Sequence, residues 1–149
     1  MRTARLTPGY VLIGAARSLS PAVDGGKILK FDTLAGSIAT LPKATGSGIP
    51  FVLLVAVLAT SNSHILKVGN AVDVFRGIIL GTRVDVGNAV QGFAAAADSD
   101  TITLNRTTTG SVSLGEWLKV HDSAPGIWSV DGVLSATGAA FATPFSATV

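Results

Sequence analysis

Histidine is the side chain that most often serves as a general acid or base, and the chain has two, His64 and His121. His121 precedes Asp122, and a carboxylate beside a histidine can orient a catalytic base. Neighbouring residues of a strand point to opposite faces, however, so this pair is not expected to act together. A nucleophilic serine would need a positioned turn, and no G-x-S-x-G occurs. For His64, the sequence predicts a surface or hydrogen-bonded structural role.

Carboxylates could support glycoside hydrolysis as a pair, or bind Ca²⁺ as a cluster. Glu116 is the single glutamate, so a pair that uses it needs an aspartate as its partner. The triplet 98–100 (DSD) offers oxygen ligands, but it lacks the EF-hand pattern and the roughly six to eight ligands that Ca²⁺ takes. Most aspartates fall at expected turns or strand ends, where backbone hydrogen bonds account for them: Asp24, Asp73, Asp98, Asp100, Asp122 and Asp131.

Other chemistry is excluded by residues and motifs that the sequence lacks. Cysteine is absent, which removes disulfides, thiolate metal sites and cysteine nucleophiles. No phosphate-binding glycine motif occurs, and the Lys and Arg residues form no cluster of the kind that nucleic acid requires. The sequence therefore predicts a protein that is not an enzyme, has no cofactor or metal, and binds no nucleic acid.

The composition instead points to assembly. Only 13% of the residues are charged, whereas 48% are hydrophobic. A 15.1 kDa monomer exposes roughly 7,000 Å², which leaves about one charge per 350 Å². This density is low for a freely soluble monomer, so we expect copies of the chain or a larger partner to cover much of the surface. The longest apolar run, residues 51–59, is too short to cross a bilayer, so no membrane partner is expected.

The elements that would position these residues are strands. Apolar residues alternate or run continuously, and turn residues interrupt them every eight to twelve positions or so, which is typical of an all-β, antiparallel β-sandwich or barrel-like domain. Two hairpins are expected, 51–59 with 64–68 and 117–121 with 127–134. In the second hairpin, the residues predicted to face the core are Leu118, Val120, Trp128, Val130 and Leu134. The other expected strands are 27–32, 38–41, 72–80, 82–86, 90–97 and 101–105.

The two ends of the chain differ from the middle. Residues 1–26 mix arginines with Pro and Gly, which favours an extended N-terminal arm, although residues 10–13 could pair as a short strand. Residues 27–149 form the single β domain, and 27–32 is expected at a sheet edge. The tail, 135–149, is too apolar for a free end, so we expect it to dock on a neighbour.

Several phrases of the chain are distinctive: DTITLN at 100–105, TTTG at 107–110, GEWLKV at 115–120, GIWSVDG at 126–132, ATPFS at 142–146, ATLPKATGSG at 39–48 and TSNSHILKV at 60–68. They resemble small structural proteins of tailed-bacteriophage virions, over about residues 36–149. The resemblance implies a capsid decoration (cement) protein. Such a protein is an all-β homotrimer on the outer surface of the capsid, where it bridges subunits of the major capsid protein.

The decoration-protein interpretation leads to expectations for individual residues, including residues of the N-terminal arm that the resemblance does not cover. The capsid contact is expected at Arg2, Arg5, Tyr10 and Arg17, and the subunit interface at Trp117, Phe141 and Phe145. One alternative within the virion is a head-fibre, tail or adaptor component. Another is a carbohydrate-binding β-module, in which Trp117, Trp128, Tyr10 or Phe93 would stack on sugar rings from one concave face.

Overall fold

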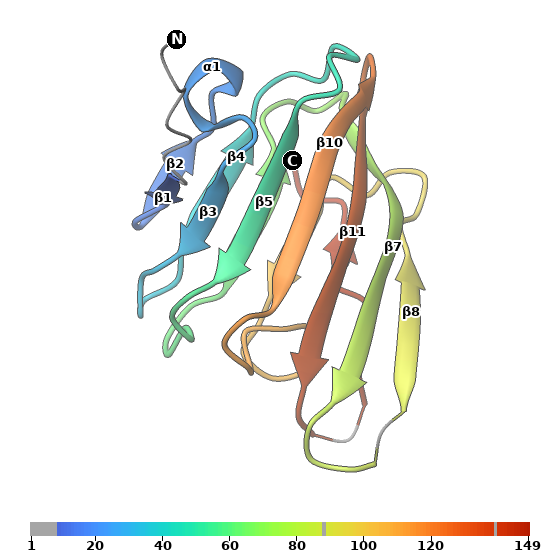
Figure 1. Cartoon of the computed structure of the whole chain (residues 1–149). Coiled ribbons are helices and arrows are strands. Elements are labelled where there is room, and N and C mark those ends of the chain that lie inside the picture. Colours follow the sequence, from blue (N-terminus) through green and yellow to red (C-terminus); the bar gives the residue numbers. More distant parts are fainter. Residues whose placement is uncertain (1–8, 88, 139) are drawn as a thin grey trace, which may run out of the picture.

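The structure is a computed structural model that describes residues 9–87, 89–138 and 140–149. Its strands form two sheets (Figure 1). The larger sheet has the spatial order β1 (Tyr10–Leu12), β3 (Ile28–Phe31), β5 (Pro50–Val55), β10 (Trp117–Ala124), β11 (Ile127–Ala136), β7 (Val74–Arg83) and β8 (Val90–Ala94). The smaller sheet has the order β12 (Phe145–Ser146), β9 (Thr101–Leu104), β6 (His64–Val68), β4 (Ile38–Leu41) and β2 (Ala16–Ser18). The all-β prediction is confirmed.

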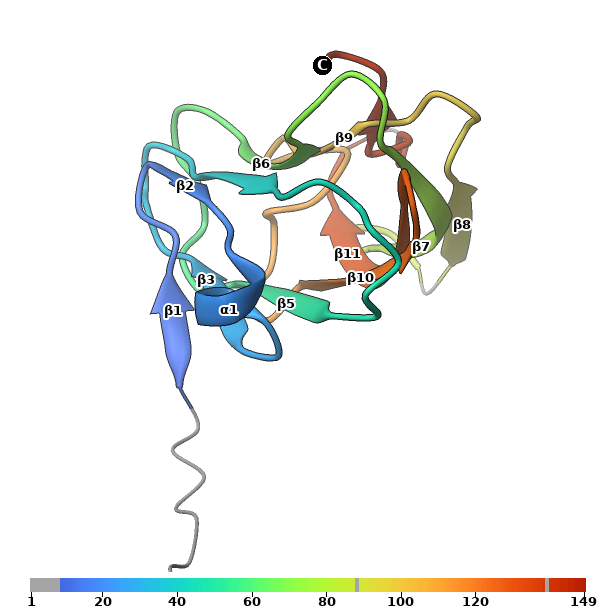
Figure 2. The same ribbon diagram turned by 90° about the horizontal axis from the view of Figure 1, so that it is seen from above.

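The two sheets lie face to face, as the view from above shows (Figure 2). Along β5, every second residue is buried, because alternate side chains of a strand point into the space between the sheets. The largest fully buried side chains there include Trp128, Phe31, Phe51 and Phe75. Every core residue predicted for the second hairpin is buried. Ile102 and Leu104 of β9 are fully buried as well.

Both sheets are mixed, which corrects the expectation of an antiparallel domain. Parallel pairs join β1 to β3, β3 to β5, β11 to β7, β2 to β4 and β4 to β6. The hairpin expected from 51–59 and 64–68 is wrong. After β5, residues 56–63 carry the chain across to the other sheet, where β6 pairs with β4 and β9. Parallel neighbours need such crossover connections, and here the crossovers run between the sheets.

The second expected hairpin is confirmed. Strands β10 and β11 pair in antiparallel fashion from Trp117 with Val133 to Ala124 with Ile127. The turn between them contains Gly126 with φ 78°, a left-handed conformation that suits glycine. β10 also pairs with β5, so the hairpin lies at the centre of the larger sheet.

The described part of the expected N-terminal arm, residues 9–26, contributes one strand to each sheet. β1 pairs with β3 in the larger sheet, and β2 pairs with β4 in the smaller one. The short helix α1 (Pro21–Asp24) follows β2. The edge position expected for residues 27–32 is wrong, because β1 lies outside β3. Residues 1–8, with Arg2 and Arg5, lie outside the described residues.

The C-terminal tail packs on its own chain. β12 pairs with β9, and Phe141 and Phe145 are buried in the core. The ring of Phe141 stacks on that of Phe93 with centroids 4.9 Å apart. Among the described residues, the helical structure is limited to α1, so no helix there has the length and apolar character needed to cross a membrane.

Candidate functional site

His64 has a structural environment. Its side chain is fully buried, and its ring stacks on Phe31 with centroids 4.9 Å apart. The Nδ1 atom accepts a hydrogen bond from the Ser37 backbone N–H at 3.0 Å, and Nε2 lies 2.8 Å from the Val57 carbonyl oxygen, to which it donates in the neutral tautomer that this pattern requires. Burial lowers the pKa of His64 below the usual histidine value of 6.5, so the neutral form is favoured. This confirms the hydrogen-bonded structural alternative.

His121 and Asp122 point in opposite directions, as expected for adjacent residues of β10. His121 is half-buried on the outer face of the larger sheet. Asp122 is buried and accepts hydrogen bonds from the backbone N–H groups of Thr45, Gly46 and Ser47 and from the hydroxyls of Thr45 and Ser47, at 2.7–3.1 Å. Burial alone would raise the pKa of Asp122, but these hydrogen bonds outweigh it and hold the pKa far below its usual range. The carboxylate fixes a loop and does not orient His121.

Glu116, the single glutamate, is used in the same way. Its carboxylate is buried and accepts hydrogen bonds from three successive backbone N–H groups, those of Ser111, Val112 and Ser113, at 2.7–2.8 Å. The hydroxyl of Ser135 donates to the same side chain. Four donors therefore occupy the carboxylate, which explains a buried glutamate without a catalytic role.

The DSD triplet also has a structural explanation. Asp100 accepts hydrogen bonds from the backbone N–H groups of Thr148 at 2.8 Å and Val149 at 3.1 Å, and from the Thr101 hydroxyl at 2.8 Å. It thereby holds the C-terminal end of the chain, whereas Asp98 is exposed. Within the described ranges, no group of three or more potential ligand side chains is arranged for a metal ion.

Two hollows on the described part of the surface each bring together no pair of acidic or basic groups. One hollow of about 490 Å³ lies between the edge strands β8 and β12, and Asp98 is the one titratable residue in its lining. Another, of about 480 Å³, lies along β2 and β4, and Lys43 is the one titratable residue in its lining. Neither offers the acid and base that proton transfer requires.

The buried histidine and carboxylates described above have structural roles. The exposed apolar side chains on the outer face of the larger sheet have no such role within the chain. The strand register places side chains on it in rows, because register partners share a face. Two rows cross all seven strands, and a shorter row of Pro50, His121, Ser129 and Arg76 lies beside the first. The first row is Tyr10, Ile28, Val52, Lys119, Asp131, Ile78 and Ala94. The second row is Leu12, Lys30, Leu54, Trp117, Val133, Leu80 and Gly92. Across these fourteen positions, the charged residues are Lys30, Lys119 and Asp131.

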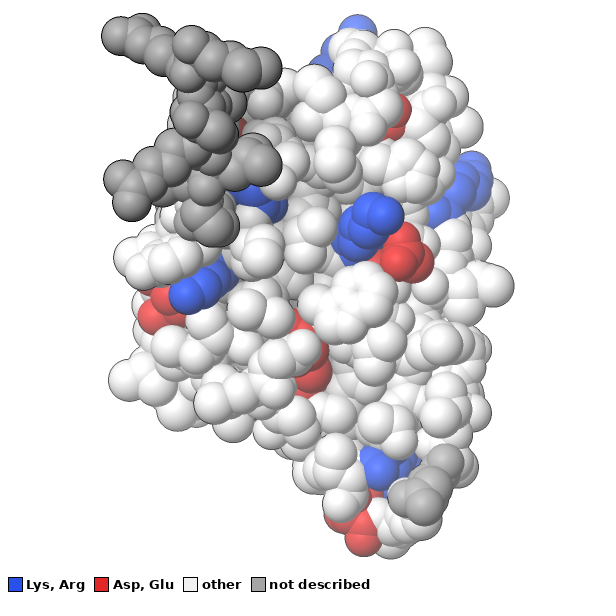
Figure 3. Space-filling view, viewed as in Figure 1, with Lys and Arg blue, Asp and Glu red and all other residues white. Residues whose placement is uncertain are grey.

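Large apolar side chains on this face are open to water. Tyr10 is 61% exposed, Ile78 55% and Ile28 48%. Leu12, Leu80 and Val133 are exposed beside them. Figure 3 views this face and shows isolated charges on a largely uncharged surface. Exposed apolar groups gathered on one sheet face mark an interaction site more often than a free surface.

The outer face of the smaller sheet differs. Its register pairs Ile38 directly with Ile65 in one row, and Thr40 with Lys67 in the other, so one row begins apolar and the other is polar. Ile38 is exposed there, and Ile65 and Lys67 are half-buried. Among the described strands, exposed apolar side chains are therefore most numerous on the outer face of the larger sheet, while others, such as Leu34, Val72 and Leu114, lie in loops.

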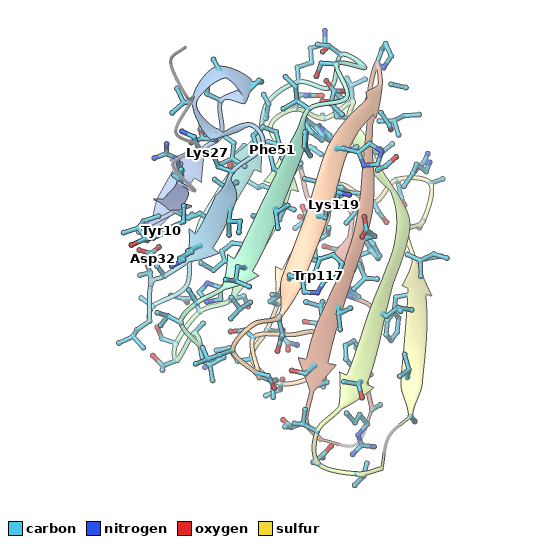
Figure 4. The ribbon with its side chains drawn as sticks, viewed as in Figure 1. Tyr10, Lys27, Asp32, Phe51, Trp117 and Lys119 are labelled. Carbon is cyan, nitrogen blue, oxygen red and sulfur yellow. The ribbon has the colours of Figure 1, made fainter. Side chains whose placement is uncertain are left out.

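The residues expected in contacts are distributed over different environments. Trp117 and Lys119 lie on β10 at the centre of the larger sheet, and Tyr10 lies on β1 at its edge (Figure 4). The ammonium group of Lys30 lies 3.6 Å from the centroid of the Tyr10 ring. Arg17 forms an ion pair with the buried Asp24 at 2.8 Å, which uses its charge within the chain. Phe141 and Phe145 pack in the core of their own chain, where little of either side chain is left for a neighbour.

Four of the exposed apolar residues were not predicted from the sequence to lie on a contact surface: Ile28, Ile78, Leu80 and Val133. Ile78, Ile79 and Leu80 are consecutive, and only the register shows that Ile79 faces the core and its neighbours face outward. One feature of the sequence could have indicated these residues. A strand with one face in water normally alternates apolar and polar residues, so a consecutive apolar run suggests that both faces are covered.

Comparison with known protein families, with curated proteins and with solved structures finds no match for this chain.

Proposed function

We propose that this chain is a structural protein of a tailed-phage virion, a capsid decoration protein that binds the outer head shell as a homotrimer and stabilises contacts between major capsid subunits. In this proposal, the chain is a β-sandwich module. The observation that carries it is the apolar outer face of the larger sheet, whose fourteen central positions include three charges. A face of this composition gains free energy when copies or partners cover it.

The buried carboxylates support a structural role. Asp122, Glu116 and Asp100 each accept several hydrogen bonds from loop or terminal backbone groups. Carboxylates engaged in this way fix loops in place, and a reacting group must instead be free to exchange a proton with a substrate. Rigid loops suit a protein that must hold its shape on a particle.

The carbohydrate-binding alternative has less support. Trp128 is 1% exposed, and Phe93 is partly buried against Phe141. Of the four aromatic residues expected to bind sugar, Tyr10 and Trp117 remain on the outer face. They lie on β1 and β10, with β3 and β5 between them. Two separated rings form no continuous platform for stacking.

The capsid anchor is proposed at Arg2 and Arg5, which precede the described residues. Arg17 is a weaker candidate because Asp24 already neutralises its charge. Tyr10 is exposed at the edge of the larger sheet and can contribute to a contact there.

The test compares particles made from a genome with an intact reading frame for this chain and one with an interrupted frame. Cryo-electron microscopy should show trimeric density on the outer shell that disappears when the frame is interrupted, and the stripped heads should release their genome at a lower temperature. Absence of the chain from particles made with the intact reading frame would contradict the proposal.

A second arm of this experiment removes residues 1–8 alone, because residues 10–12 and 16–18 already form β1 and β2. The deletion should leave the trimer intact and reduce its occupancy on the shell. The matched control replaces two lysines elsewhere, Lys43→Ala with Lys67→Ala, and should retain full occupancy. Full occupancy after the deletion would assign the anchor to another surface.

A further inference from the structure

The outer face of the larger sheet carries two exposed apolar patches, one toward each edge. We define the β1/β3 patch as Tyr10, Leu12 and Ile28 with Lys30. We define the β7/β11 patch as Ile78, Leu80 and Val133 with Asp131. Between them, Val52, Leu54 and Trp117 are half-buried. The most exposed apolar groups therefore lie on two separate sides of one face.

The outer face of the larger sheet is wide enough for two neighbouring molecules to bind side by side. Seven strands with a spacing of about 4.8 Å extend over roughly 29 Å, and the right-handed twist turns the two edges in different directions. A single partner that covers both patches would need a surface with the matching curvature. Two neighbouring copies, each covering one patch, need no such match.

The charges of the two patches are opposite. Lys30 belongs to the β1/β3 patch, and Asp131 belongs to the β7/β11 patch, with Lys119 beside Asp131 toward the centre of the sheet. A contact between identical patches would bring Lys30 near the Lys30 of the next copy, which is unfavourable. A contact between unlike patches brings Lys30 near Asp131. The charge arrangement therefore favours the unlike pairing.

The exposed area is of the size that such a contact uses. One patch from each of two copies supplies six exposed apolar side chains, and a standard interface buries about 1,600 Å² in total, of which somewhat more than half is apolar. The flanking Leu54, Trp117 and Ala94 can supply the remaining apolar area. In a closed ring, each copy is held by two such contacts.

We infer that copies of this chain meet through unlike patches, with the β1/β3 patch of one copy packed against the β7/β11 patch of the next. A contact between two different surfaces is heterologous and closes into a ring when its rotation permits. This inference rests on the proposed function, in which the ring has three members. It assigns the outer face of the larger sheet to neighbouring copies.

The chain has no cysteine, so introduced thiols report contacts without background. The test uses Ile28→Cys for the β1/β3 patch and Ile78→Cys for the β7/β11 patch, two isoleucines of similar exposure in the same row. Each variant is expressed alone or co-expressed with the other, and is treated with a short bifunctional maleimide. The matched control is Ile38→Cys on the outer face of the smaller sheet.

The inference predicts that neither single variant cross-links to itself, whereas the co-expressed pair gives a covalent dimer. The variant with both substitutions should give a ladder that ends at the trimer. Ile38→Cys should give no product alone or with either partner. Self-linked dimers from the single variants, no product from the co-expressed pair, or a ladder that continues beyond the trimer would overturn it.

Sedimentation of the unmodified chain separates the two proposals. A wild-type monomer would contradict the proposed assembly itself. A wild-type trimer whose single-cysteine variants link to themselves would contradict the unlike pairing alone.

Discussion

Asp122 shows how a single side chain can hold a distant loop of this fold in place. Its carboxylate takes hydrogen bonds from Thr45, Gly46 and Ser47, more than seventy positions earlier in the chain. Glu116 and Asp100 have equivalent roles for residues 111–113 and for the C-terminal end. In each case, one acidic side chain satisfies backbone N–H groups that no strand can pair, because they lie in loops.

We therefore expect Asp122→Asn to destabilise the fold. The amide presents one acceptor oxygen and no charge, so buried donors of the 45–47 loop lose their partners, at a cost of about 2–3 kcal/mol. Urea unfolding followed by tryptophan fluorescence measures this loss. Asp98→Asn, at an exposed turn position outside both apolar patches, is the control and should change the unfolding free energy by less than about 0.5 kcal/mol. Equal effects of the two substitutions would contradict the assigned role.

The same carboxylates predict loss of stability in acid. For Asp24, Asp100 and Asp122, burial would raise the pKa, but hydrogen bonds outweigh it and lower the pKa below the usual aspartate value of 3.8. The unfolded chain then binds more protons than the folded chain, so their contribution is complete above about pH 4 and is lost as the pH falls below it. Thermal unfolding between pH 5 and pH 2 should show the decline, and Asp122→Asn should reduce its slope. A flat profile would contradict the prediction.

His64 predicts a separate effect nearer neutral pH. Burial lowers its pKa below 6.5, so the unfolded chain takes up a proton that the folded chain excludes. Its contribution is complete above about pH 7 and decreases as the pH falls below about 6.5. His64→Gln should be less stable at pH 8 but should lose less stability than the wild type between pH 7 and pH 5. An identical slope for both proteins would show that His64 does not titrate in this way.

At the scale of elements, the sequence predicted where strands occur better than how they pair. The hairpin of β10 and β11 was predictable because its strands are consecutive and joined by a Pro-Gly turn. The separation of β5 from β6 was not, because residues 60–63 resemble a hairpin turn, whereas residues 56–63 carry the chain to the other sheet. Pairing between distant segments, such as β7 with β11, depends on tertiary packing that local patterns do not contain.

The candidate surface was harder to predict for a related reason. Strand β7 is apolar on both faces, so its sequence does not show which side chains are inside. Phe141 and Phe145 were expected between subunits because the tail is apolar, but the tail covers its own core. Trp117, in contrast, was expected at the subunit interface and does lie on the apolar outer face, where that role stays a prediction.

Gly81 of β7 gives a test of how the tail docks. A Cβ atom at this position would lie 2.2 Å from the Phe141 ring, so the glycine leaves the space that the ring occupies. Gly81→Ala should therefore destabilise the protein by about 1–3 kcal/mol through overpacking. Gly92→Ala on β8 is the control, because its methyl group would make an ordinary contact at 3.5 Å. Thermal unfolding compares the two, and a neutral Gly81→Ala would contradict the docking of Phe141.

At the scale of the whole molecule, the exposed apolar residues are unevenly distributed between the two sheets. Among the strands, most exposed apolar residues lie on the outer face of the larger sheet, whereas the outer face of the smaller sheet has a polar row that includes Thr40 and Lys67. This difference fits the proposed assembly, in which neighbouring copies cover the outer face of the larger sheet and the outer face of the smaller sheet stays in water.

Charge placed on the apolar face should therefore separate the copies. Ile78→Asp should convert the oligomer to monomers without loss of the β signal in circular dichroism, because the side chain is exposed and lies outside the core. Ile38→Asp, on the outer face of the smaller sheet, is the matched control and should remain assembled. Light scattering after size-exclusion chromatography distinguishes the two results. Dissociation by both substitutions would indicate a general loss of stability.

The most direct test of the assembly account is the mass of the purified, full-length chain in analytical ultracentrifugation at micromolar concentration. The account predicts one species with three times the 15.1 kDa mass of the chain. A single species of 15.1 kDa would contradict it, because the apolar face would then remain in contact with water.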